Sequence, residues 1–562
     1  MNLGGLGKYS FLSIFLGLLL WCLFCISSSA QLDPSNLFKL CCLALFGLTL
    51  VRPICGIGMF LIFMPFLGGS KPEDEHTVRF LTLLSTTVFA STLYLAYAFM
   101  RQGKKIECNF YHPLTFALLI YWLITAISLV SVSPNDVVFS IFSFQSPLTR
   151  QFLNLSEGST VYPYLAFFAL TISFLFGVLI INLASAPKRM LFLVRCFLSG
   201  LLLTVFLGLL DYYDFINLNT IRPWYFLAGF GENYRFEHLT SVFGNPGWYA
   251  QYLVLGAPAL LAILALQWQK KWKIALLVSL MIVTEFCIIL IYQRGGWLSY
   301  PLTLIIIWFC VYVLDGEGRN FSHHMQAIKG SLIKIAITLP ITIAISLSLV
   351  YFTARMQPEN RQQLSGFAQR AESITNANDR VKYWEPSFLM ARLHPLFGPG
   401  VESFSSQYEK LYIAPGHLYV QTPKYDVAPY YGSAHNLYFQ TLAGKGFLGL
   451  FSLFGLFLAV FTLVWRGIFS PSASQLTLSQ PQRLILMMTL AYTCALAIYG
   501  NVGEIFYSPI GYISFVLFFA ASIGAVPATY HLSRRFRVWV LSLLACAFVL
   551  HLYFEFGVKL GL

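Results

Sequence analysis

Three short motifs carry side chains suited to phosphate chemistry. Arg294 lies in Tyr292-Gln-Arg-Gly-Gly-Trp297, Arg380 in Asn378-Asp-Arg-Val-Lys-Tyr-Trp384 and His435 in Ser433-Ala-His-Asn-Leu-Tyr438. Arginine binds phosphate oxygens through a planar fork and stays charged at any working pH. A neutral imidazole can accept a proton from an attacking hydroxyl. Together, the two guanidinium groups and the imidazole suit a site that holds a pyrophosphate and activates a hydroxyl.

Arg294 is predicted to lie at a corner between two membrane spans, on the outer side. A cation is disfavoured there unless an anion holds it, and a phosphate would do so. The alternative is an arginine whose head reaches up to the lipid headgroups. Gly295 and Gly296 favour the phosphate interpretation, because a corner without side chains lets a bulky ligand approach the backbone.

Arg380 follows Asn378 and Asp379, which are good N-cap residues, so we expect it in the first turn of a helix. Helix amide groups and the helix dipole favour an anion at that position. The alternative is a solvated loop charge. Trp384 lies one turn further along as a candidate substrate contact, and Pro386 is expected to kink or end the helix.

His435 and Asn436 are predicted to open the next span, with the imidazole as proton acceptor and Asn436 as a substrate contact. A capping or interfacial histidine remains an alternative. Asn245, in Phe243-Gly-Asn-Pro-Gly-Trp248, is a candidate substrate contact that could also be an N-cap before Pro246.

The loop at 211–245 contains Arg222, Arg235 and His238 among aromatic residues. Such a mixture could line a sugar site or form an interfacial aromatic belt. Glu285 is predicted in the middle of a span, where a carboxylate is unfavourable without a partner, so it is either structural or functional.

Composition limits the class of protein. The chain is 57% hydrophobic and 10% charged, which excludes a soluble globular domain. Its formal charge of +13 follows the positive-inside rule rather than a nucleic-acid surface, because no basic stripe with interleaved aromatics occurs. The sequence contains neither a metal-ligand motif nor a Gly-x-x-x-x-Gly-Lys phosphate loop, so we expect no metal and no cofactor.

Apolar windows long enough to cross a bilayer recur along the chain and predict an all-α polytopic helix bundle with about 13 to 15 spans. We expect a retained first span rather than a cleaved signal peptide. The expected spans are 9–29, 36–51, 53–69, 78–100, 113–133, 162–183, 190–210, 246–267, 274–292, 296–314, 332–352, 436–465, 483–500, 508–528 and 538–556.

Alternate loops are basic, which assigns them to the cytoplasm and places all the motifs above on the outer side. The largest outer loop spans 353–434 and contains eight Lys or Arg and seven Asp or Glu residues. Its periodicity predicts short helices near 359–374 and 381–393. Functional loops of this length are commonly lids or binding elements.

The order of these motifs resembles the O-antigen ligase and O-antigen polymerase superfamily of membrane glycosyltransferases. The chain has a Gly-Asn-Pro helix start, an Arg-Gly corner, an Arg-x-x-x-Trp helix, the turn Pro395-Leu-Phe-Gly-Pro-Gly400, a His-Asn helix start and Gly444-Lys-Gly-Phe-Leu-Gly449. These cover about residues 240–465. We therefore divide the chain into N-terminal helices (1–240), a ligase-like catalytic region (241–465) and C-terminal helices (466–562).

The resemblance implies a GT-C-like bundle in the bacterial inner membrane whose active site faces the periplasm. It also implies an undecaprenyl-pyrophosphate-linked glycan donor, with Arg294 and Arg380 on the pyrophosphate and His435 activating the acceptor. The acceptor stays open: a ligase uses lipid A core, a polymerase another carrier-linked glycan, and a protein O-oligosaccharyltransferase a Ser or Thr hydroxyl. A transporter or flippase of the same envelope polysaccharide pathway, and a non-catalytic scaffold, are the alternatives from other classes.

Overall fold

The computed structural model describes residues 34–66, 75–102, 112–132, 161–184, 186–216, 218, 239–243, 246–265, 271–291, 293–315, 337–352, 378–408, 411, 433–469, 478–503, 509–525 and 532–553. The predicted span at 9–29 and the helix expected near 359–374 lie outside these ranges. Within them the regular secondary structure is helical, which confirms the predicted all-α class.

Apart from two helices that fall in the expected outer loop 353–434, the α-helices follow the apolar windows of the sequence closely. They are α2 (Pro34–Val51), α3 (Pro53–Phe63), α4 (Glu75–Gln102), α5 (Pro113–Ser128), α7 (Val161–Leu183), α8 (Pro187–Tyr212), α10 (Pro246–Ala265), α11 (Lys271–Leu290), α12 (Arg294–Asp315), α15 (Asn378–Leu393), α16 (Phe404–Tyr408), α17 (Leu437–Phe469), α18 (Gln480–Tyr499), α19 (Pro509–Ala525) and α20 (Arg534–Leu552). A further apolar helix covers Ile337–Phe352, and 3-10 turns form η1 (Met64–Phe66), η2 (Leu129–Ser131) and η6 (Ser241–Phe243).

The chain is a multi-pass membrane protein. Among the described residues, seven helices are long and apolar enough to cross a membrane, and five shorter apolar helices of 10–17 residues accompany them. Prolines begin several of the helices, where the missing backbone N–H leaves no bond unmade. Local sequence therefore determines where these helices start.

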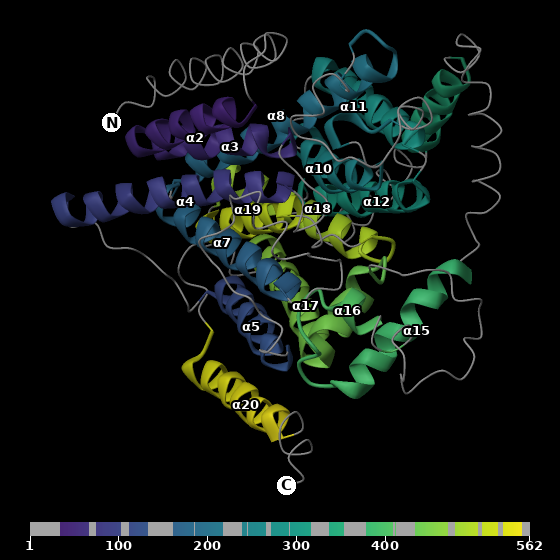
Figure 1. The fold of residues 1–562 in the computed structure, drawn as a ribbon. Coiled ribbons are helices and arrows are strands. Elements are labelled where there is room, and N and C mark those ends of the chain that lie inside the picture. Colours follow the sequence, from purple (N-terminus) through teal and green to yellow (C-terminus); the bar gives the residue numbers. More distant parts are fainter. Residues whose placement is uncertain are drawn as a thin grey trace.

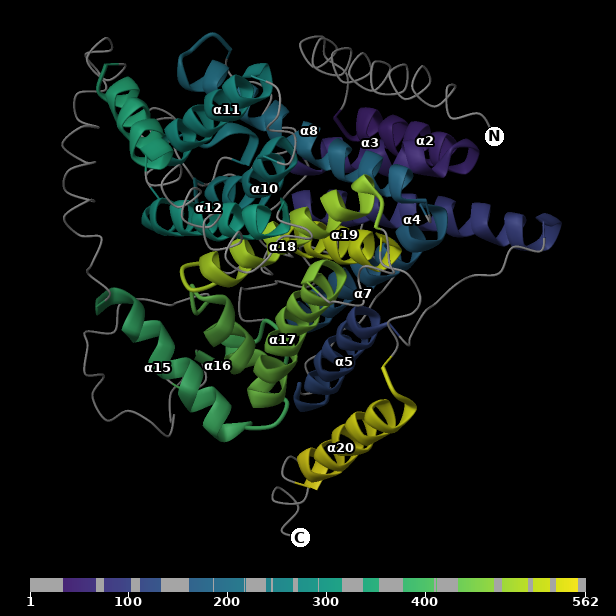
Figure 2. The ribbon, with the colours of Figure 1, turned by 180° about the vertical axis from the view of Figure 1, so that it is seen from behind.

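The helix α18 lies at the centre of the bundle, where it packs against α10, α12, α17 and α19 (Figures 1 and 2). On one side α7 packs against α19, and α3 packs against α8. On the other side α17 packs against α5 and α15. The helices α10, α12 and α17 begin at one end of the bundle, and α18 ends there. We call this end of the bundle the motif end.

The helix α17 is broken at Gly446, whose φ of 64° and ψ of −167° are not helical. The turn at 395–400 packs into this break, with Phe447 N donating to Pro395 O at 2.8 Å and Leu448 N donating to Leu396 O at 3.1 Å. A Cβ on Gly446 would lie 2.6 Å from Pro395 O, so only glycine fits. The two glycine motifs of the sequence thus interlock.

The sequence expectation for α17 is wrong, and the expectation for Pro386 is wrong in one of its two alternatives. The predicted single span 436–465 is two helical arms that meet at Gly446. Pro386 does not end α15, which continues to Leu393. Pro386 and Ser387 are buried, and this packing outweighs the backbone bond that the proline removes.

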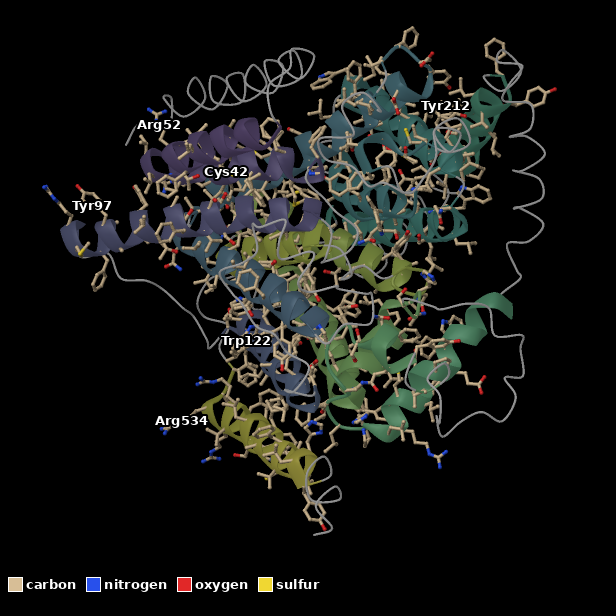
Figure 3. The ribbon with its side chains drawn as sticks, viewed as in Figure 1. Cys42, Arg52, Tyr97, Trp122, Tyr212 and Arg534 are labelled. Atoms are coloured by element: carbon tan, nitrogen blue, oxygen red, sulfur yellow. The ribbon has the colours of Figure 1, made fainter. Side chains whose placement is uncertain are left out.

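The helix α20 stands apart from the bundle. Figure 3 shows Arg534 at its start, pointing away from the other helices. At the opposite end His551 is buried, with Nε2 2.9 Å from Ser131 Oγ and its ring 5.1 Å from that of Phe397. The end of α20 therefore contacts both η2 and the turn that enters the break in α17.

Candidate active site

The Arg294 corner is tight and closed by backbone hydrogen bonds. Helix α11 ends at Leu290 and α12 begins at Arg294, as the sequence predicted. Gln293 O accepts Gly296 N at 2.9 Å, and Trp297 Nε1 donates back to Ile288 O at 3.0 Å. These bonds hold the backbone of Arg294 at the motif end, while its side chain lies outside the described part of the structure.

Close packing inside the protein limits the side chain at both corner glycines. Gly295 is buried, and a Cβ added to it would lie 2.5 Å from Val502 Cγ2. A Cβ on Gly296 would lie 3.3 Å from Ile288 Cγ2. Gly295 therefore makes room for the chain that follows α18, and the approach of a ligand to this corner stays a prediction.

His435 lies two residues before α17, as predicted, and is exposed with a left-handed φ of 48°. Asn436 is buried and caps the helix, because its Oδ1 accepts Tyr438 N at 2.9 Å and Phe439 N at 3.1 Å. Its Nδ2 donates to Asn501 O at 2.9 Å. The Asn436 amide is thus used inside the protein, and a substrate contact by this residue stays a prediction.

The turn 499–503 joins the three helix starts of the motif end, and sequence reasoning missed it. Gly500 O accepts Leu437 N at 2.7 Å, and Tyr499 OH donates to Gly247 O at 3.2 Å in the first turn of α10. Val502 meets Gly295 at the start of α12. The sequence Tyr-Gly-Asn-Val-Gly at the end of a span indicated a helix stop, but nothing local indicated its partners.

Arg380 is the third residue of α15, as predicted, and α15 packs along α17. Trp384 stacks on Phe439 with ring centroids 4.9 Å apart, and further along both chains Pro395 bonds Phe447. The two segments therefore run parallel. Arg380 precedes Trp384 by one helical turn, and Trp384 packs on Phe439 in the first turn of α17, so a position of Arg380 near His435 stays a prediction.

Trp384 combines an aromatic face with a buried donor. Trp384 is half-buried where it stacks on Phe439. Phe388 packs edge-on against the Phe439 ring, with ring centroids 5.3 Å apart. The Nε1 atom of Trp384 is buried and has no acceptor among the residues that the structure describes. A buried indole N–H ordinarily finds an acceptor, so a ligand oxygen would suit it.

The remaining predicted contacts lie outside the described residues. These are Asn245, Arg222, Arg235 and His238. The described elements that flank Asn245 are η6, which ends at Phe243, and α10, which begins at Pro246, as the N-cap interpretation of Asn245 requires. The hydrogen bond from Tyr499 to Gly247 brings this helix start to the turn 499–503.

Glu285 has structural partners. It is buried in α11, where Oε1 accepts Thr342 Oγ1 at 3.0 Å and Oε2 lies 3.5 Å from Ser346 Oγ. Both hydroxyls belong to the helix Ile337–Phe352. The carboxyl therefore links two helices, which matches the structural alternative that the sequence left open.

The arrangement brings together helix starts that can present cations and a base to one anionic ligand. The first turns of α10, α12 and α17 adjoin the turn 499–503, and α15 packs on the first turn of α17 through Trp384 and Phe439. Helix N-termini favour anions through their unpaired amides and their dipoles. Geometry of this kind fits binding of a diphosphate next to an exposed imidazole.

Comparison with known families agrees with the motif order. Residues 279–454 match the family model described as O-Antigen ligase, which confirms the resemblance to the O-antigen ligase superfamily. The matched segment contains Arg294, Arg380 and His435 but not the turn 499–503. No curated protein matches the chain.

Proposed function

From the premise that residues 279–454 form an O-antigen ligase domain of a membrane glycosyltransferase, we propose that the chain transfers glycan from undecaprenyl pyrophosphate to an acceptor hydroxyl. The reaction takes place on the periplasmic face of the bacterial inner membrane. One observation carries the proposal: the segments that hold Arg294 and His435 both contact the turn 499–503. The proposal adds that Arg380, in the first turn of α15, reaches the same site.

The reaction is an inverting displacement. The acceptor oxygen attacks the anomeric carbon of the carrier-linked sugar, and the bond from that carbon to the pyrophosphate oxygen breaks. His435 takes the proton of the attacking hydroxyl. Arg294 and Arg380 offset the charge that develops on the departing pyrophosphate, so the step needs no metal ion. Trp384 stacks against the glycan or donates to one of its oxygens.

A reconstituted transfer assay tests this proposal. The full chain is placed in lipid vesicles with lipid-linked glycan that has been isolated from cells lacking this protein. Product formation is then measured for the wild type and for the variants Arg294→Ala, Arg380→Ala and His435→Ala. Loss of one transition-state contact commonly costs 100- to 1000-fold in kcat, so we expect about that loss for each variant. The matched control is Arg392→Ala, an exposed arginine in the last turn of α15.

The acceptor is decided in the same assay. Lipid A core, a second lipid-linked glycan and a Ser- or Thr-containing peptide are offered in separate reactions, and the one that gains mass identifies ligase, polymerase or protein oligosaccharyltransferase activity. Full transfer by all three variants would contradict the assignment of the site. Absence of transfer by wild type to every acceptor would contradict the proposed function.

A further inference from the structure

Two buried residues that the proposed reaction does not use, Glu402 and Gln440, form a chain of hydrogen bonds that reaches the backbone beside His435. Gln440 Nε2 donates to Glu402 Oε2 at 2.8 Å, and Gln440 Oε1 accepts Ala434 N at 2.9 Å. Relative exposure is 9% for Glu402, 7% for Gln440 and 0% for Ala434, so water competes little for these bonds. The chain of hydrogen bonds ends one peptide unit from the imidazole.

The carboxylate decides which way the Gln440 amide points. An ionised carboxylate accepts hydrogen bonds and cannot donate them, so the amide NH₂ must face Glu402. The amide oxygen is then presented to Ala434 N, which needs an acceptor. Without Glu402, the amide could turn over and place two donors against each other.

A compensating charge lies in the same cluster. Lys445 is buried, its Nζ donates to Tyr121 OH at 2.6 Å, and it interacts electrostatically with Glu402. The phenol of Tyr512 in α19 also interacts electrostatically with Glu402. A buried carboxylate needs a compensating cation and a hydrogen-bond donor, and Lys445 and the Gln440 amide supply these to Glu402.

His435 needs support from both sides. Its φ of 48° is unusual for a residue with a side chain and persists only where the flanking structure holds it. On one side Gln440 holds Ala434, and on the other the carbonyls of Gly500 and Asn501 hold the start of α17. The imidazole is therefore carried by a short strained segment with both ends fixed.

We propose that Glu402 and Gln440 are positioning residues for His435: the carboxylate orients the Gln440 amide, and the amide fixes the backbone that presents the imidazole to the acceptor hydroxyl. The inference rests on the proposed function and adds a buried relay to the same site. Neither residue touches the reacting atoms, so its effect falls on the rate of the chemical step rather than on donor binding.

The test compares an apolar and an ionisable replacement of Gln440 in the full chain, with the isolated lipid-linked glycan as donor. Gln440→Met removes the relay at similar volume, and we expect kcat to fall on the order of 10- to 100-fold with an unchanged KM for the donor. The control Ser522→Ala removes a buried 2.6 Å bond to Thr489 at a distance from the site and should leave kcat unchanged.

Gln440→Glu gives a pH signature that loss of stability alone would not produce. Two adjacent buried carboxyls share a proton, which raises the pKa of one of them. Below that pKa the shared proton replaces the amide hydrogen and restores the relay, whereas the relay is lost as the pH rises through it. Activity relative to wild type should therefore fall with rising pH for Gln440→Glu and stay low at all pH for Gln440→Met.

Each outcome is informative. Wild-type kcat in Gln440→Met, or a flat ratio to wild type across pH in Gln440→Glu, overturns the inference while His435→Ala is inactive. Full activity of His435→Ala instead overturns the proposed function. If Gln440→Met is not recovered as folded protein, the pH dependence of Gln440→Glu decides alone.

Discussion

The contact between Gly295 and Val502 gives the sharpest steric prediction. In Gly295→Ala the new Cβ would lie 2.5 Å from Val502 Cγ2, about 1 Å short of the 3.5–4.0 Å at which carbon atoms pack. Overpacking of this kind costs about 1–3 kcal/mol, partly offset by the 0.5–1 kcal/mol that alanine gains over glycine in a helix. We therefore expect a modest loss of stability and a shift of about 1 Å in the Arg294 corner.

A shift of that size can lower kcat by about 100-fold even when the protein stays folded. The assay is glycan transfer in vesicles, together with thermal unfolding of the purified chain. Val502→Gly removes both Val502 Cγ2 and Val502 Cβ, which would lie 2.5 Å and 2.8 Å from the new Cβ, so the double variant Gly295→Ala with Val502→Gly should recover most of the rate. The control is Gly455→Ala in α17, where an added Cβ meets nothing within 4 Å. A wild-type rate in Gly295→Ala, or no recovery in the double variant, would refute the role of this contact.

Two further predictions concern buried polar groups. Asn436→Ala should lower stability by about 1–3 kcal/mol through loss of the cap and of the bond to Asn501, whereas Asn436→Ser, which keeps the cap, should recover about 1 kcal/mol in thermal unfolding. Equal loss in both variants would contradict this division. Glu285→Ala should cost about 1–3 kcal/mol because the hydroxyl of Thr342 loses its acceptor, yet the remaining folded protein should keep its kcat. Complete loss of transfer in a stable Glu285→Gln variant would instead give this carboxyl a functional role.

Helix positions were predictable from the sequence because their signals are local. The expected span 246–267 is α10 at Pro246–Ala265, and the proline explains where it begins. The corner at Arg294 and the first-turn position of Arg380 followed from the same kind of signal. These features depend on residues within a few positions of each other, which a single sequence displays.

Features that depend on distant partners were not predictable. The break at Gly446 depends on the turn 395–400, and the need for glycine at 295 depends on Val502. The relay from Glu402 to Ala434 likewise joins residues that no local pattern connects. Hydropathy described residues 466–562 only as further spans, so the turn 499–503 was assigned no role at the site.

The central claim is that Arg294, Arg380 and His435 meet at one site outside the membrane. Paired cysteines at 380 and 435, in a chain whose 11 native cysteines are replaced, can be tested in intact vesicles with a short membrane-impermeant bifunctional thiol reagent. A pair at 384 and 439, whose rings are stacked, is the positive control for proximity. We expect efficient cross-linking of 380 to 435, and of 294 to 435, from the outer side. Cross-linking of the control pair alone, or labelling of any of the three positions only from the cytoplasmic side, would contradict a shared site on the outer side.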